Sequence, residues 1–203
     1  MIAHHIHDAL AQVRRLQGLI LERQLFRGYS GKARLLCGLL SIIGAGVIAG
    51  HAEGGPTAVL LGWGAVLLAG LLLNYCSLLY WFLFDREVRR NPAMLKPALD
   101  AVPALAVGAV LTVALIRLGA HDLLYGTWMA LYGLAQVAYK KSLPQGIYSV
   151  GIGYIACGVF CLLNPAVSFL NPWPMGAVFF VGECAGGAIL MLKNQADVHA
   201  VGT

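Results

Sequence analysis

Long apolar stretches with very few charged residues are the feature that most constrains the fold of this chain. Six of them cover approximately residues 34–51, 57–84, 99–118, 122–139, 145–163 and 174–192. A helix needs roughly 20 apolar residues to cross the hydrocarbon core of a bilayer, and these stretches are about that long. Backbone groups in lipid must bond within their own segment, and none of the stretches alternates like a barrel strand. The sequence therefore predicts an all-α, polytopic membrane helix bundle with six transmembrane helices.

The low charge content supports a bilayer, rather than water, as the solvent of the fold. Of the 203 residues, 59% are hydrophobic and only 11% are charged, whereas a soluble domain carries about 25% charged residues. The formal net charge of +5 raises the possibility of a nucleic-acid partner. We exclude it, because the positive residues stand at the ends of apolar stretches and form no patch of their own. The lipid bilayer is the expected partner.

The distribution of lysine and arginine predicts an orientation. Basic residues precede the first stretch, lie between the second and third and between the fourth and fifth, and follow the sixth. Because short cytoplasmic loops are enriched in Lys and Arg, this pattern predicts three in–out–in hairpins in an inner (plasma) membrane, with both termini cytoplasmic. The predicted cytoplasmic basic face includes Arg14, Arg15, Arg86, Arg89, Arg90, Lys140 and Lys141.

The chain divides into three predicted parts. Residues 1–30 form a cytoplasmic arm, residues 31–193 the transmembrane domain, and residues 194–203 a short cytoplasmic tail. In the arm, apolar residues such as Val13 and Leu16 recur at helical spacing, which indicates an amphipathic helix. Such a helix either lies on the inner leaflet or docks to a protein partner or a second copy. Ser30 is the expected N-cap of the first span.

Glu183 is the one acidic residue inside the sixth stretch, in the sequence FFVGECAGG. It lies about nine residues into that span and so close to the bilayer midplane, at 1.5 Å per residue. An ionised carboxylate there costs at least about 3 kcal/mol on insertion scales. We therefore expect a protonated Glu183 that is hydrogen-bonded to Asn74, or to a tyrosine hydroxyl such as that of Tyr75. Arg34 is assigned to the basic residues that precede the first span.

The helix face that carries Glu183 is narrow. It is lined by four glycines, which predict close approach of another helix and place Glu183 inside the bundle. The four glycines are Gly176, Gly182, Gly186 and Gly187. Two roles for Glu183 follow: a polar clasp between helices, or a proton or cation site in a transport path.

Other sequence features give little chemistry. The five cysteines, Cys37, Cys76, Cys157, Cys161 and Cys184, all fall in apolar stretches and are expected to pack there as small apolar residues. The outer loop 164–174, with two Asn-Pro pairs, either lies flat at the outer surface, which is favoured, or covers the bundle. No nucleotide-binding glycine loop, HExxH, GxSxG or CxxC motif is present. We therefore expect no metal site and no cofactor.

Two classes of function remain. The favoured one is a non-enzymatic membrane partner or scaffold that docks through its basic cytoplasmic face and its N-terminal helix. The alternative is a small permease or channel, acting as an oligomer, with Glu183 as an intramembrane proton or cation site. A membrane enzyme ranks third, because the spans hold no cluster of polar residues at one depth.

Overall fold

The computed structural model describes residues 10–16, 30–84, 102–138 and 144–201. Apart from short turns these residues are helical, and no strand occurs among them, so the all-α prediction is confirmed. Four of the described helices are long and apolar enough to cross a membrane. They are α2 (Gly31–Ala49), α3 (Gly55–Phe84), α7 (Gln145–Leu163) and the apolar part of α8 (Trp173–Val201).

Two shorter helices complete the bundle. They are α5 (Val102–Arg117) and α6 (Leu124–Ala138), and single 3-10 turns, η1 (Ala52–Gly54) and η3 (His121–Leu123), precede α3 and α6. A short helix also covers residues 10–16 of the predicted arm. The helix α8 continues to Val201, through most of the segment that the sequence assigns to a separate tail.

The first membrane-length helix begins earlier than the apolar stretch does. The hydroxyl oxygen of Ser30 accepts the backbone N–H of Ala33 at 3.3 Å, so Ser30 is the N-cap of α2, as expected. The helix therefore starts at Gly31 and includes Arg34 in its first turn. This start places Arg34 within the helix and buried, whereas the sequence assigns it to the basic residues that precede the first span.

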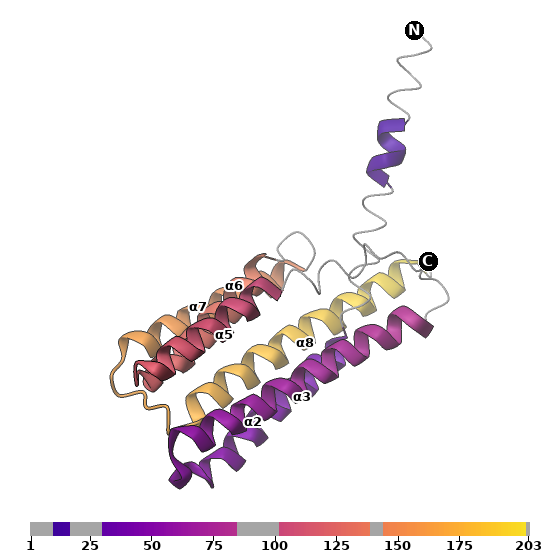
Figure 1. Cartoon of the computed structure of the whole chain (residues 1–203). Helices are drawn as coiled ribbons and strands as arrows, with labels where there is room; N and C mark the ends of the chain where they lie inside the picture. Colours follow the sequence, from indigo (N-terminus) through magenta and orange to yellow (C-terminus); the bar gives the residue numbers. More distant parts are fainter. Residues whose placement is uncertain (1–9, 17–29, 85–101, 139–143, 202–203) are drawn as a thin grey trace.

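The helices form two groups of three (Figure 1). One group is α2, α3 and α8, in which α2 lies antiparallel along α8; the other is α5, α6 and α7, in which α6 lies antiparallel along α7. Glycines allow the close approach in the second group: a Cβ on Gly133 would lie 2.6 Å from the Gly151 oxygen, and one on Gly158 would lie 2.7 Å from the Ala130 nitrogen. Small residues at helix contacts are typical of membrane bundles.

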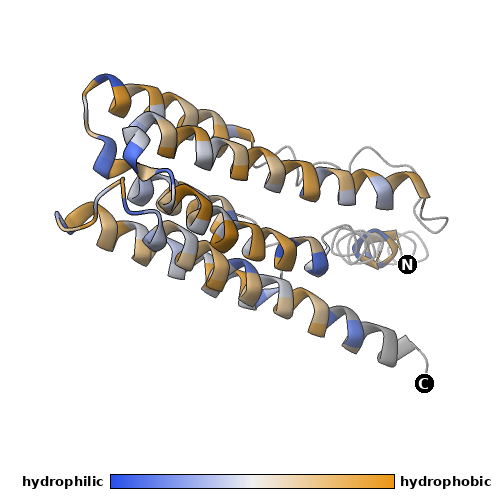
Figure 2. Cartoon of the chain, turned by 90° about the horizontal axis from the view of Figure 1, so that it is seen from below, coloured by the Kyte–Doolittle hydropathy of each residue, from blue (hydrophilic) through white to orange (hydrophobic). Residues whose placement is uncertain are grey.

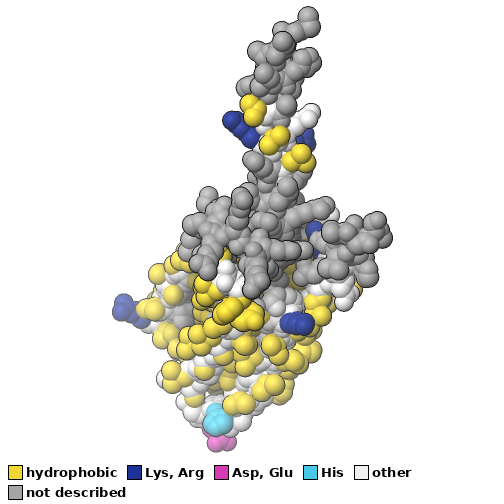
Figure 3. All heavy atoms as spheres, turned by 90° about the vertical axis from the view of Figure 1, so that its right-hand side faces the viewer, with side chains coloured by type: hydrophobic (Ala, Val, Ile, Leu, Met, Phe, Trp, Pro, Cys, Tyr) yellow, Lys and Arg dark blue, Asp and Glu magenta, His cyan; other side chains and the backbone are white. Residues whose placement is uncertain are grey.

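The outer faces of the helices are apolar. Figure 2 shows hydrophobic residues along the lengths of the helices, with strongly hydrophilic residues in the turns and near the helix ends. Figure 3 shows the same pattern on the surface, where hydrophobic side chains predominate and few charged ones appear. Leu61 on α3 and Val110 on α5 are 70% and 69% exposed. A surface of this kind suits contact with lipid better than contact with water.

The loop between α7 and α8 is tied to the end of the bundle. The indole N–H of Trp63 on α3 donates to the Tyr125 hydroxyl at 3.0 Å, and that hydroxyl donates to the Phe169 carbonyl at 2.7 Å. The backbone N–H of Phe169 donates to the Asp122 carboxylate at 2.7 Å. Phe169 is only 1% exposed. This part of the loop thus covers the bundle, the alternative to lying flat at its surface, because its backbone finds polar partners on η3 and α6.

Candidate functional site

The carboxylate of Glu183 is the centre of the candidate site. Glu183 lies on α8, midway between Trp173 and Lys193, the ends of the apolar part of that helix. Its side chain is buried, with 3% of the residue exposed. Side chains from α2, α6 and α7 converge on it, so both helix groups contribute to one polar cluster.

Arg34 is the main partner of Glu183. Its Nε donates to Oε2 at 2.9 Å and its Nη2 donates to Oε1 at 2.8 Å, which is a bidentate ion pair. Arg34 itself is only 7% exposed. A guanidinium stays protonated in proteins, and both carboxylate oxygens act as acceptors, so this is the geometry of an ionised glutamate. The expectation of a protonated Glu183 without a cation partner is therefore replaced by a buried ion pair.

Two tyrosines complete the coordination of the carboxylate. The Tyr132 hydroxyl on α6 donates to Oε1 at 2.7 Å, and the Tyr154 hydroxyl on α7 lies 3.2 Å from the same oxygen. The Tyr154 hydroxyl also lies 3.4 Å from the Phe179 carbonyl, so its single proton is shared between two acceptors. The rings of Tyr132, Tyr154 and Phe179 pack against one another with centroids 5.0–5.1 Å apart. We call Arg34, Tyr132, Tyr154 and Glu183 the ion-pair cluster.

The expected partners on α3 lie elsewhere. The Asn74 amide donates to the Gly70 carbonyl at 3.0 Å and contacts the Cys37 sulfur at 3.1 Å, on an exposed part of α3. Tyr75, the next residue, is 36% exposed. Asn74 is on α3, and α3 packs mainly against α2. The helix α2 in turn covers the face of α8 that Asn74 would have to reach to contact Glu183. Tyrosine hydroxyls do bind Glu183, but they come from α6 and α7 and not from Tyr75 on α3.

The four glycines predicted on α8 all lie at helix contacts. A Cβ on Gly182 would collide with the Tyr154 ring, and one on Gly186 would lie 2.8 Å from the Arg34 Cζ. A Cβ on Gly187 would lie 2.7 Å from the Gly31 carbonyl oxygen, and one on Gly176 would collide with the Ala45 side chain. Two of these glycines thus make room for α2, and two make room for side chains of the ion-pair cluster.

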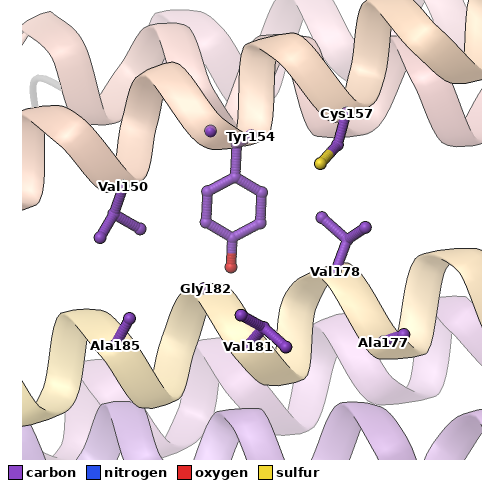
Figure 4. Close-up of a pocket in the computed structure, with 9 residues that line it drawn as sticks. Val150, Tyr154, Cys157, Ala177, Val178, Val181, Gly182 and Ala185 are labelled. Carbon is purple, nitrogen blue, oxygen red and sulfur yellow. The ribbon is translucent and has the colours of Figure 1, made fainter.

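An apolar groove of about 390 Å³ lies beside the cluster, between α7 and α8. Figure 4 shows Tyr154 projecting from α7 toward α8, with Val150 and Cys157 on either side of it. The Tyr154 hydroxyl thus belongs both to the ion-pair cluster and to the wall of the groove. The other lining residues are aliphatic, glycine or cysteine.

The residues of the predicted basic face lie on an exposed helix or outside the described residues. Arg14 and Arg15 are exposed on the helix of residues 10–16. Arg86, Arg89, Arg90, Lys140 and Lys141 of the predicted basic face lie outside the described residues. In the part of the chain that the structure describes, no three His, Cys, Asp or Glu side chains gather closely enough to hold a metal ion.

The two tyrosines make a testable contrast. Tyr132→Phe removes a short hydrogen bond to a charged acceptor and is expected to destabilise the protein by about 1.5–3 kcal/mol. Tyr154→Phe should cost less, since its hydroxyl bond to Glu183 is longer and shared with Phe179. Unfolding midpoints in lipid–detergent micelles measure both effects. The exposed Tyr80→Phe is the control and should change little; equal costs for Tyr80 and Tyr132 would contradict the assigned bonds.

No family model, no curated protein and no solved structure matches this chain. The role of the ion-pair cluster therefore has to be inferred from its own geometry.

Proposed function

We propose that this is a non-enzymatic, multi-pass membrane protein that docks a partner through its N-terminal helix and its basic cytoplasmic face. The observation that carries the proposal is the character of residues 10–16. Leu10, Val13 and Leu16 are 51%, 49% and 58% exposed, next to the exposed Arg14 and Arg15. In Figure 3 this short described helix, at the top of the view, presents both hydrophobic and basic side chains. A helix that exposes an apolar stripe beside basic residues is suited to bind another surface.

The full hydrogen bonding of the Glu183 carboxylate supports a structural role for Glu183. Its carboxylate accepts hydrogen bonds from Arg34, Tyr132 and Tyr154, and close helix contacts surround it. A carboxylate whose oxygens are all engaged has little capacity to bind a passing solute. We assign the cluster the role of a clasp that holds the two helix groups together at mid-span.

Six spans in three hairpins are part of the proposal. The helix α6 packs along α7 through Gly126 and Gly158 at one end and Gly133 and Gly151 at the other, so it occupies the same depth as a membrane-length helix. The helix α5 packs in turn on α6, where the Trp128 indole donates to Thr112 at 2.8 Å. Helices that accompany a spanning helix along its length share its solvent, which argues that α5 and α6 also cross the membrane.

In the proposed topology, both termini lie on the cytoplasmic side of an inner (plasma) membrane. Arg14, Arg15, Lys32 and Lys193 belong to the ends that this topology puts inside, whereas Arg117 is on the outer side. The excess of positive residues at one side supports this orientation.

The docking role is tested with the full chain purified from its membrane in mild detergent. A co-purifying companion is expected, and it should be lost both on deletion of residues 1–28 and in Val13→Ser/Leu16→Ser, which removes the apolar stripe without changing charge. Gln12→Ser, also exposed but outside the stripe, should retain the companion. The proposal fails if the companion survives both arm variants, or if the wild-type protein carries no companion.

A permease or channel is the second candidate, and one observation favours it. The ion-pair cluster joins side chains from both helix groups at mid-span, where movement of one group against the other would have to break it. A pH-dependent cation flux into liposomes that disappears in Glu183→Gln would establish this function in place of the clasp. The absence of flux in the wild-type protein would remove it.

A further inference from the structure

The clasp leaves the apolar groove between α7 and α8 without a role. One wall of the groove belongs to each helix group, so it lies on the seam where the two groups meet. Its lining comes from residues 150–157 of α7 and residues 177–185 of α8. Its volume of about 390 Å³ falls within the range of sites that hold small apolar ligands, about 300–1,000 Å³.

The groove lies at mid-depth of two membrane-length helices. Tyr154 is the middle residue of α7, and Gly182 adjoins Glu183, which is midway along the apolar part of α8. Along α8 the lining covers residues 177–185, which is about 12 Å at 1.5 Å per residue. The hydrocarbon core of a bilayer is about 30 Å thick. In a membrane the whole groove is therefore surrounded by acyl chains and lies out of reach of the lipid headgroups.

The lining offers no partner to water or to an ion. None of the lining residues is charged, and all except Tyr154 and Cys157 are aliphatic or glycine. The hydroxyl of Tyr154 is already engaged, at 3.2 Å from the Glu183 carboxylate and 3.4 Å from the Phe179 carbonyl. Apolar cavities stay dry and take up apolar ligands, and an empty groove would forfeit dispersion contacts. The chemistry of the groove thus calls for a hydrocarbon occupant.

The rim of the groove is unsuited to a second copy of the chain. Its exposed lining residues are Gly153, Ala177, Val181 and Ala185, none of them larger than valine. A two-fold contact brings the same patch of both copies together, so it would set one groove against the other and fill neither. An acyl chain needs only a concave apolar surface that is open along its side. Figure 4 shows the small side chains of α8 beneath the ring of Tyr154.

We propose that an acyl chain of a bilayer phospholipid occupies this groove and packs against the ring of Tyr154. The chain comes from the leaflet at the Trp173 end of α8, because most of the α8 lining lies on that side of Glu183. It fills the seam between the helix groups beside the clasp, so a lipid contributes to holding the groups together. This binding site is independent of the docking role proposed for the N-terminal helix.

Photo-crosslinking of the full chain in lipid vesicles tests the proposal. The vesicles are phosphatidylcholine, and a small fraction of the lipid carries a diazirine in the half of one acyl chain that ends at the bilayer centre. After irradiation, mass spectrometry maps the lipid adducts on residues 177–185 of α8. Gly153→Leu fills the groove from α7, where a Cβ meets no atom within 4 Å apart from its own helix backbone and chain neighbours. Gly64→Leu on α3 is the matched control, since Gly64 is equally open and exposed but outside the groove.

We expect adducts on α8 in the wild-type protein, a similar yield in Gly64→Leu and a several-fold lower yield in Gly153→Leu. Equal yields in all three proteins would overturn the proposal, because the chain would then only pass over the surface as ordinary bilayer lipid. A wild-type protein without adducts on α8 would overturn it as well, since protein would then cover the groove. If Gly153→Leu does not fold, Ala185→Leu fills the groove from α8, and the adducts are read on residues 150–157 of α7.

Discussion

Arg34→Met is expected to destabilise the protein by about 3–5 kcal/mol, because it leaves the Glu183 carboxylate buried without its cation. Methionine keeps much of the length of the arginine side chain, so the change removes charge and hydrogen bonds rather than volume. The unfolding midpoint in lipid–detergent micelles measures the loss. The matched control is Lys32→Met on the exposed face of the same helical turn, which should cost less than about 1 kcal/mol. Equal effects at the two positions would argue against the buried pair.

Gly182→Ala is the second change with a large expected effect. A Cβ at this position would collide with the Tyr154 ring, which is held between α6 and α8 and bonded to Glu183. Overpacking of this kind costs about 1–3 kcal/mol, and displacement of Tyr154 should remove a hydrogen bond as well. Thermal unfolding in micelles is the measurement.

Gly153→Ala is the control for that substitution. Gly153 lines the same groove from α7, and apart from the backbone of its own helix and its chain neighbours no atom lies within 4 Å of the Cβ that alanine would add. Alanine favours a helix over glycine by about 1 kcal/mol, so this variant should be neutral or slightly more stable. If Gly153→Ala loses as much stability as Gly182→Ala, the loss comes from added volume in the groove and not from the contact with Tyr154.

The helical architecture and the burial of Glu183 follow from local features of the sequence. Apolar length predicts the membrane-length helices, and Ser30 predicts the cap of α2, because both signals depend only on neighbouring residues. The glycines near Glu183 predict close contacts by the same local logic, and Gly182 and Gly186 indeed face Tyr154 and Arg34.

The partners of Glu183 depend on tertiary packing, which the sequence does not encode at short range. Arg34 resembles any basic residue at the end of a span, and only the start of α2 at Gly31 brings it inside. Placing α2 against α8 brings Arg34 to Glu183 and keeps Asn74 on the far side of α2. Tyr132 and Tyr154 become donors because α6 and α7 meet α8 at that depth. The Ser30 cap was the available signal that Arg34 lies within the helix.

The most direct test of the clasp is a double-mutant cycle between Arg34 and Glu183. Glu183→Gln removes the charge but keeps an oxygen acceptor for the two tyrosines, and alone it leaves Arg34 buried without its anion. The double variant Arg34→Met/Glu183→Gln has no buried charge. We predict that it is more stable than either single variant, with the costs of the single changes far from additive. If the double variant instead loses the sum of the two single losses, the two residues act independently and the ion-pair clasp is contradicted.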